Sequence, residues 1–105
     1  MVRDIFHAFA AGNRAFIERT FADDLTFSSP VDPLLDRAGY FARCWPGAGR
    51  GQAFTFVRLI ESGDQVVVTY EMTKDAGGKA RNTEVFTFSG DKVRAVEVYF
   101  GWDVR

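Results

Sequence analysis

The order of apolar and polar residues divides the chain into an N-terminal part of helices and a C-terminal part of strands. In "VRDIFHAFA", apolar residues recur at helical spacing, and Gly12 with Asn13 is a signal that ends a helix. A second short helix carries Phe16 and Ile17 on its apolar side, and we expect it to end at the acidic turn of residues 22–24. The chain is therefore predicted to begin with two short helices.

The next segment predicts one short strand and a third helix. "DLTFSS" alternates apolar and polar residues, so we expect a strand there, which Pro30 ends. Asp36 is a suitable N-cap for a helix that runs through "YFARCW" and ends at Pro46 and Gly47.

From Gln52 onward, the chain predicts four longer strands. The turns between them contain Gly63-Asp64, Gly77-Gly78 and Gly90-Asp91. Successive hairpins of this kind form an antiparallel meander. Helices followed by a long curved sheet predict a single α+β domain, residues 1–105, with the helices packed on one face of the sheet.

The composition is typical of one globular core, and it contains more aromatic residues than such a core requires. Eleven phenylalanines raise the aromatic fraction to 15%, so ring area can close the core and also line a cavity. The formal net charge is −1 with acids and bases interspersed, and we therefore expect no nucleic-acid partner. No apolar run approaches the ~20 residues of a membrane span, so no membrane partner is expected either.

Cysteine and histidine are too few to form a metal site. Cys44 is the only cysteine, which excludes an internal disulfide and is typical of a reducing compartment, so we expect a cytoplasmic protein. With His7 as the only histidine, the chain has no residues at metal-ligand spacing, and we expect neither a metal nor another cofactor.

The segment "RNTEVFTFSG" places an acid on an apolar strand face. With a period of two, Asn82 and Glu84 share a face with Phe86 and Phe88. The register with the last strand decides what this face meets, because a slip of one residue exchanges the two faces of a strand.

Two possible lengths of the loop between the last two strands place different residues opposite Glu84. A two-residue loop at residues 90–91 sets Glu84 opposite Glu97, and like charges directly opposed are unfavourable. A three-residue loop at residues 90–92 sets Glu84 opposite Val98 instead. Turn chemistry favours the shorter loop, whereas charge and packing favour the longer one, and we adopt the longer one.

The preceding hairpin is consistent with this register if its loop covers residues 75–79. Tyr70 is then opposite Glu84, and Met72 is opposite Asn82. The inward face becomes an apolar wall with two polar groups in it, formed with Val68, Phe86, Val96, Val98 and Phe100. Burial in such a wall should raise the pKa of the Glu84 carboxyl.

The outward face of the same strands differs in character. It combines polar and apolar side chains, namely Thr83, Val85, Thr87, Glu97 and Tyr99. Such a mixed surface suits an interface, and we expect a homodimer formed through the outer sheet face.

The whole chain resembles the nuclear transport factor 2-like superfamily, and within it the SnoaL-like and ketosteroid-isomerase-like branch. The resemblance is carried by the order of elements and by "FADDLTFSSP", "YFARCW" and "GDKVRAVEVYFGW". It implies a cone-shaped α+β barrel in which a curved antiparallel sheet wraps around the helices and leaves a ligand pocket at its open end.

The resemblance also assigns residues to positions of known chemistry. Glu84 falls at the position of the isomerases' pocket acid, which donates a hydrogen bond to the substrate oxygen, and Asn82 lies one inward step before it. Ser29, before Pro30, replaces the isomerases' general base, and Ile5 lies near the position of their first-helix tyrosine. Steroid isomerisation by that mechanism is therefore not expected.

Epoxide-hydrolase-like members of the superfamily place paired acids and an arginine in their pocket. In this chain the inward positions of the last strand are Val98 and Phe100, so that arrangement is absent as well.

Two hypotheses for function remain open. The first is an isomerase-, cyclase- or hydrolase-type enzyme acting on a small hydrophobic molecule, with Glu84 as acid, base or hydrogen-bond donor and Asp32, on the loop at the mouth, as a second catalytic candidate. The second is a non-catalytic ligand-binding or dimerisation module. In both, the expected pocket residues are Asn82, Tyr70, Met72, Phe86, Val96, Val98, Phe100, Tyr40, Phe41, Phe27 and Ser29.

Overall fold

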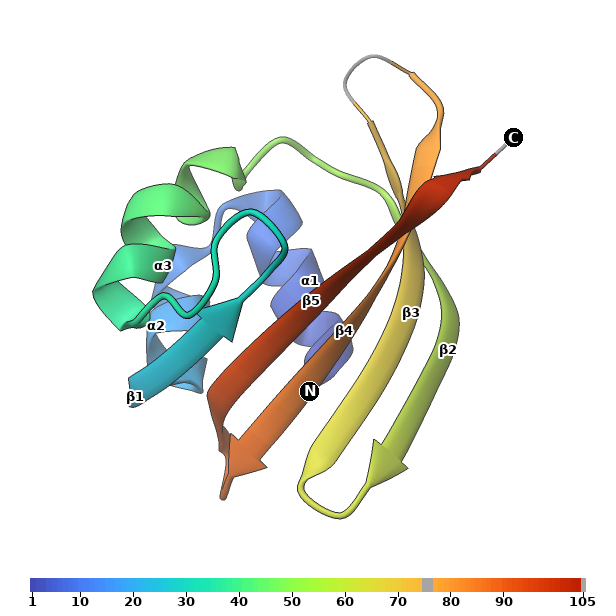
Figure 1. Ribbon diagram of the computed structural model, residues 1–105. Coiled ribbons are helices and arrows are strands. Elements are labelled where there is room, and N and C mark those ends of the chain that lie inside the picture. The colour runs from blue at the N-terminus through green and yellow to red at the C-terminus, as the bar shows by residue number, and fades with distance from the viewer. Residues whose placement is uncertain (75–76, 105) are drawn as a thin grey trace.

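The computed structural model describes residues 1–74 and 77–104 and shows an α+β fold (Figure 1). The helical part consists of α1 (Val2–Ala11), α2 (Arg14–Thr20), α3 (Arg37–Arg43) and the short 3₁₀ helix η1 (Trp45–Gly47). The strands are β1 (Phe21–Ser28), β2 (Phe54–Ser62), β3 (Gln65–Thr73), β4 (Lys79–Ser89) and β5 (Lys92–Val104).

The strands form one curved sheet in the order β1-β5-β4-β3-β2, and the helices cover its concave face (Figure 1). The antiparallel meander from β2 to β5 and the α+β class are confirmed. In addition, β1 pairs with β5 in parallel, with Phe27 beside Val96. This pairing joins the first strand to the last one and closes the cone on the side of α3.

Caps mark the predicted end of α1 and the predicted start of α3, but the predicted end of the third helix at Pro46 and Gly47 is wrong, because α3 ends at Arg43 and the 3₁₀ helix η1 follows it. Gly12 adopts the left-handed conformation with φ 72° at the end of α1, and Asn13 accepts a hydrogen bond from the backbone N–H of Phe16 at the start of α2. Asp36 accepts a hydrogen bond of 2.7 Å from the backbone N–H of Gly39, which confirms it as the N-cap of α3.

The prediction of an acidic turn at residues 22–24 is wrong. The chain passes from Thr20, the last residue of α2, directly into β1 at Phe21. Ala22 is buried while Asp23 and Asp24 are exposed, so both acids are in contact with solvent within a strand. The acidic pair is a surface feature of β1 and not a chain reversal.

The core is built around an aromatic cluster centred on Phe6 of α1. Its ring packs edge-to-face against Tyr70, Phe54 and Phe56, at centroid distances of 4.7, 5.0 and 5.4 Å. Phe6 is 5% exposed, and Val68 beneath it is fully buried. This packing fixes α1 across β2 and β3, and it sets the depth of the space that remains between the helices and the sheet.

The register of the last hairpin places Glu84 as predicted. Glu84 pairs with Val98, and Phe86 pairs with Val96. The inward face of β4 therefore meets valines of β5, and the carboxyl of Glu84 is not opposed by that of Glu97.

The predicted three-residue loop at 90–92 is nevertheless wrong. Ser89 pairs with Lys92, so the turn has two residues, and the register then shifts between Thr87 and Phe88. The residue added to β5 by this bulge is Arg94. The bulge lets the short turn and the favourable pairing of Glu84 occur together, so that the two conflicting sequence signals are both satisfied.

The predicted pairing of the preceding hairpin is wrong by two residues. Thr73 pairs with Lys79, so Tyr70 lies opposite Asn82 and Glu84 lies opposite Val68. Part of the predicted loop at residues 75–79, namely 75–76, lies outside the described residues. Because strand side chains alternate with a period of two, a shift of two leaves the same residues facing inward.

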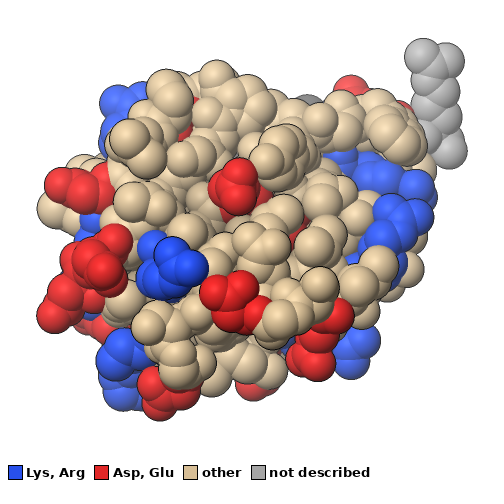
Figure 2. Space-filling model, turned by 60° about the horizontal axis from the view of Figure 1, so that its bottom comes forward, with Lys and Arg blue, Asp and Glu red and all other residues tan. Residues whose placement is uncertain are grey.

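The surface carries charges of both signs. On the face shown in Figure 2, acidic side chains lie among basic ones, and uncharged residues cover most of the area between them. Within the described part of the chain, no helix is long and apolar enough to cross a membrane.

Candidate functional site

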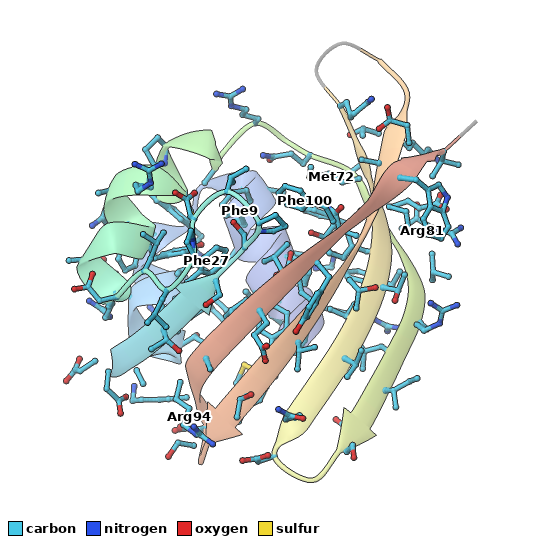
Figure 3. All side chains as sticks on the ribbon, viewed as in Figure 1. Phe9, Phe27, Met72, Arg81, Arg94 and Phe100 are labelled. Carbon is cyan, nitrogen blue, oxygen red and sulfur yellow. The ribbon has the colours of Figure 1, made fainter. Side chains whose placement is uncertain are left out.

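A cavity of about 290 Å³ lies between the helices and the concave face of the sheet. Figure 3 shows Phe9 of α1, Phe27 of β1, Met72 of β3 and Phe100 of β5 gathered around it, whereas Arg94 lies away from it. Its mouth is bordered by exposed apolar groups, with Val31 68% exposed and Phe100 54% exposed. The cavity is therefore open at one end and apolar throughout most of its wall.

The structure places both catalytic candidates, Glu84 and Asp32, in the wall of this cavity. With them are ten of the expected pocket residues, namely Asn82, Tyr70, Met72, Phe86, Val96, Val98, Phe100, Tyr40, Phe27 and Ser29.

Phe41 does not line the cavity. The guanidinium groups of Arg14 and Arg37 lie over its ring, at 4.4 and 5.2 Å from the ring centroid. Neighbouring residues of a helix point in directions about 100° apart, so α3 can direct Tyr40 inward only by turning Phe41 toward α2. Phe41 is part of the contact between α3 and α2.

Seven lining residues were not among the expected ones. They are Ile5, Phe6, Phe9, Phe21, Val31, Cys44 and Phe54. Several belong to the apolar stripe of α1, whose helical spacing was the available signal. That spacing identifies the buried side of the helix but does not distinguish core from cavity wall.

Glu84 is held in the wall by one neutral hydrogen-bond donor. The hydroxyl of Tyr70 donates to Oε2 of Glu84 over 2.5 Å, along the diagonal between β3 and β4. Burial raises the pKa of the Glu84 carboxyl to about 7, and the Tyr70 hydrogen bond lowers it in part. Near neutral pH this carboxyl can therefore either donate or accept a proton.

Asn82 and Tyr70 hold Glu84 in a short polar chain. Burial raises the pKa of Tyr70, and Glu84 raises it further, while a hydrogen bond from Asn82 lowers it. The Oδ1 atom of Asn82 accepts from the backbone N–H of Gly101 at 3.3 Å. Gly101 lies so close to β4 that an added Cβ would be 2.2 Å from the carbonyl oxygen of Arg81, so only glycine permits this approach.

Asp32 is held at the mouth by Arg43. The Nε atom of Arg43 donates to Oδ1 of Asp32 at 2.5 Å, and the side chain of Asp32 is only 15% exposed. The Oγ atom of Ser29 accepts hydrogen bonds from the backbone N–H groups of Val31 and Asp32, at 3.3 and 3.1 Å. Ser29 thus shapes the turn that presents Asp32 to the cavity.

Two further ionisable groups of the wall are kept neutral. Burial, together with the nearby Asp32, raises the pKa of the Cys44 thiol to about 11, although Arg43 acts in the opposite direction. Burial also raises the pKa of Tyr40, as do Cys44 and Glu84. The thiol is therefore not an activated nucleophile at neutral pH.

A family comparison agrees with this architecture: residues 2–96 match the SnoaL-like domain. The chain belongs to the SnoaL-like domain family. No curated protein matches the chain.

Solved structures share the fold of this SnoaL-like domain at low sequence identity. An NTF2-like protein from Burkholderia xenovorans has a TM-score of 0.77 and 21% identity, over 94% of this chain and 78% of that one. An NTF2-like protein from Mesorhizobium loti has a TM-score of 0.80 and 13% identity, over 95% and 87%. A candidate polyketide cyclase from Acidithiobacillus ferrooxidans has a TM-score of 0.69 and 20% identity, over 92% and 82%.

This SnoaL-like domain presents two different carboxyl groups to one cavity. Glu84 lies deep in the wall with a neutral partner, and Asp32 lies near the mouth with a cationic partner. Among the residues that the structure describes, no group of three or more potential ligands is arranged to hold a metal ion. The two carboxyl groups of the cavity wall are able to form hydrogen bonds and to transfer protons.

Proposed function

We propose that this SnoaL-like domain binds a small, largely apolar molecule in its cavity and acts on it as an isomerase- or cyclase-type enzyme through Glu84. The observation that carries the proposal is a carboxyl group that lies in an aromatic wall with only a neutral hydrogen-bond donor beside it. Ionisable groups whose pKa is shifted toward neutrality inside a pocket are typical of functional sites.

The hydrogen bond from Tyr70 determines where the proton of Glu84 resides. Because Oε2 accepts from Tyr70, the proton of the neutral acid belongs on Oε1, which has no hydrogen-bond partner among the described residues. Oε1 can then donate to a carbonyl oxygen of a bound ligand. The proton passes from Oε1 to that oxygen as negative charge forms on it during enolisation or ring closure, and the proton lost from the ligand carbon is taken up by solvent at the open mouth.

The likeness to a candidate polyketide cyclase is compatible with this chemistry, since ring closure onto a carbonyl requires a donor at the carbonyl oxygen. At 20% identity the likeness supports the fold, and the assignment of Glu84 rests on the geometry of the cavity.

A non-catalytic binding module is the second candidate, and Ser29 favours it. The Ser29 hydroxyl oxygen is used by two backbone N–H groups and is no base, so the end of β1 contributes no proton acceptor of its own. We also propose that the protein is cytoplasmic and forms a homodimer through the outer face of the sheet, where Tyr99 is 52% exposed.

Turnover and binding of a panel of cyclic ketones and epoxides would test the proposal. We expect at least one ring ketone to bind and react, and we expect Glu84→Gln to lower turnover by about 100-fold or more while it still binds. Glutamine keeps a hydrogen-bond donor but cannot transfer a proton. Glu97→Gln, on the outer face of β5, is the matched control and should leave turnover unchanged.

Three outcomes decide between the candidates. Turnover that survives Glu84→Gln contradicts the role of Glu84. Binding without turnover in the unaltered protein favours the binding module. Failure of every ring compound to bind contradicts both.

A further inference from the structure

We infer that the ligand is an uncharged compound of one or two fused rings that carries a carbonyl at its inner end and a hydroxyl at its outer end, with the hydroxyl bound by Asp32. This inference rests on the proposed function and adds to it the class of ligand and a binding role for Asp32.

The size and lining of the cavity point to rings. Its volume of about 290 Å³ is at the lower limit of ligand pockets, which range over ~300–1,000 Å³. Nine of its nineteen lining residues are aromatic. Aromatic side chains pack well against the faces and edges of flat rings, so a compact ring system matches this wall better than a flexible chain does.

The charges of the wall exclude an anionic ligand. No lysine or arginine of the described chain lines the cavity, whereas both Asp32 and Glu84 do. At the mouth, the Nε atom of Arg43 is bound to Asp32, and the side chain of Arg43 is 61% exposed. A carboxylate or phosphate placed inside would lose its hydration and lie beside two acids, one of which already occupies Arg43.

The polar groups lie at different depths and require different ligand atoms. Glu84 is flanked by Val68, which is fully buried, so it faces the inner end of a bound molecule. Asp32 follows Val31, which is 68% exposed, so it faces the outer end. Oδ1 of Asp32 is bound to Arg43, while Oδ2 has no hydrogen-bond partner among the described residues.

An uncharged hydroxyl is the group that fits this free oxygen. A carboxylate accepts hydrogen bonds and cannot donate them, so the ligand atom at the mouth must be a donor. A hydrogen bond to a charged acceptor is stronger than one between neutral groups, so a ligand hydroxyl at this position should increase the binding affinity measurably.

Binding of three tetralones measured by calorimetry would test the inference. The probes are a tetralone, the same compound with a hydroxyl at the ring carbon farthest from the ketone, and the same compound with a carboxylate there. We expect the hydroxyl to tighten binding to the unaltered protein by about tenfold. We expect the carboxylate to weaken it by at least as much.

Asp32→Ala is the decisive variant. The turn should persist because the Ser29 hydroxyl binds backbone N–H groups that alanine retains. In this variant the hydroxylated and plain tetralones should bind equally. Asp23→Ala, on the exposed side of β1, is the control and should keep the tenfold difference.

The outcomes separate this inference from the proposed function. If the plain tetralone binds and Glu84→Gln abolishes turnover in the panel of ring compounds, but the hydroxyl preference is absent or survives Asp32→Ala, the role of Asp32 is refuted and that of Glu84 stands. Tighter binding of the carboxylate refutes the exclusion of anions. If no tetralone binds, the inference about the ligand falls, whereas the proposed function falls only if the whole panel of ring compounds also fails to bind.

Discussion

Two glutamates on opposite faces of the sheet have contrasting partners. Glu71, on the outer face of β3, accepts two hydrogen bonds from Arg81, at 2.5 and 3.2 Å, and Arg81 in turn lies over the ring of Trp102. Glu84, on the inner face of β4, has only the neutral hydroxyl of Tyr70. Both acids are largely covered by protein.

The difference indicates which acid is suited to proton transfer. The two hydrogen bonds from Arg81 link Glu71 to the neighbouring strand, so Glu71 serves to hold β3 and β4 together on the outer face. A neutral donor orients a carboxyl without fixing its charge, so Glu84 can change its protonation state near neutral pH.

The largest expected effect is on the pH dependence of stability. Because the pKa of Glu84 is about 7 in the folded protein and near 4.5 in the unfolded chain, the folded state binds more protons between these values. The free energy of unfolding therefore falls as pH rises from about 4.5 to 7, by up to about 3 kcal/mol from this group.

Urea unfolding at a series of pH values would measure this effect. Glu84→Gln should remove the slope, and Glu71→Gln should retain it because Glu84 is still present. A slope that is unchanged in Glu84→Gln would show that its carboxyl is solvated.

A smaller effect on stability is expected from breaking the ion pair between Glu71 and Arg81 on the outer face of the sheet. Glu71→Ala leaves the charge of Arg81, whose side chain is 29% exposed, without its carboxylate partner, and should lower the free energy of unfolding by about 1–2 kcal/mol. Thermal unfolding would measure the loss. Arg81→Met, which keeps a long side chain beside Trp102 but removes the charge, should be less harmful than Arg81→Ala; equal losses would mean that the charge pair dominates.

The smallest expected effect is a change in the pKa of Glu84 when its neutral hydrogen-bond donor is removed. Tyr70→Phe keeps the ring against Phe6 but removes the hydrogen bond that lowers the pKa of Glu84, so that pKa should rise further. Carboxyl NMR, with the signal assigned through Glu84→Gln, would detect the change. A fall in the pKa would mean that water replaces the hydroxyl.

The inward direction of Glu84 could be predicted because two simple rules agree on it. Strand alternation puts Glu84 in line with Phe86, and avoidance of the pair Glu84–Glu97 selects the register. The way in which the chain achieves that register could not be predicted, because a bulge at Arg94 leaves no distinctive residue type in the sequence.

Other features depended on long-range packing that local patterns do not contain. The parallel contact of β1 with β5 joins segments far apart in the chain, and Phe41 points away from the cavity because α2 lies beside α3. The sequence predicts Tyr70 directly opposite Glu84, which is wrong by two residues. The two side chains nevertheless meet, because the hydrogen bond from Tyr70 to Glu84 runs diagonally between β3 and β4.

The bulge in β5 also has a genetic consequence. On either side of Arg94, Val93 pairs with Phe88 and Ala95 pairs with Thr87, which are consecutive partners on β4. An in-frame loss of codon 94 would therefore leave a regular ladder from Ser89 to Asn82, with Glu84 still opposite Val98. Loss of the codon between Val96 and Val98 would instead turn the inward-facing residues after that point in β5 outward, and the outward-facing ones inward. The tolerance of this gene to single-codon deletions should therefore change sharply within a few codons.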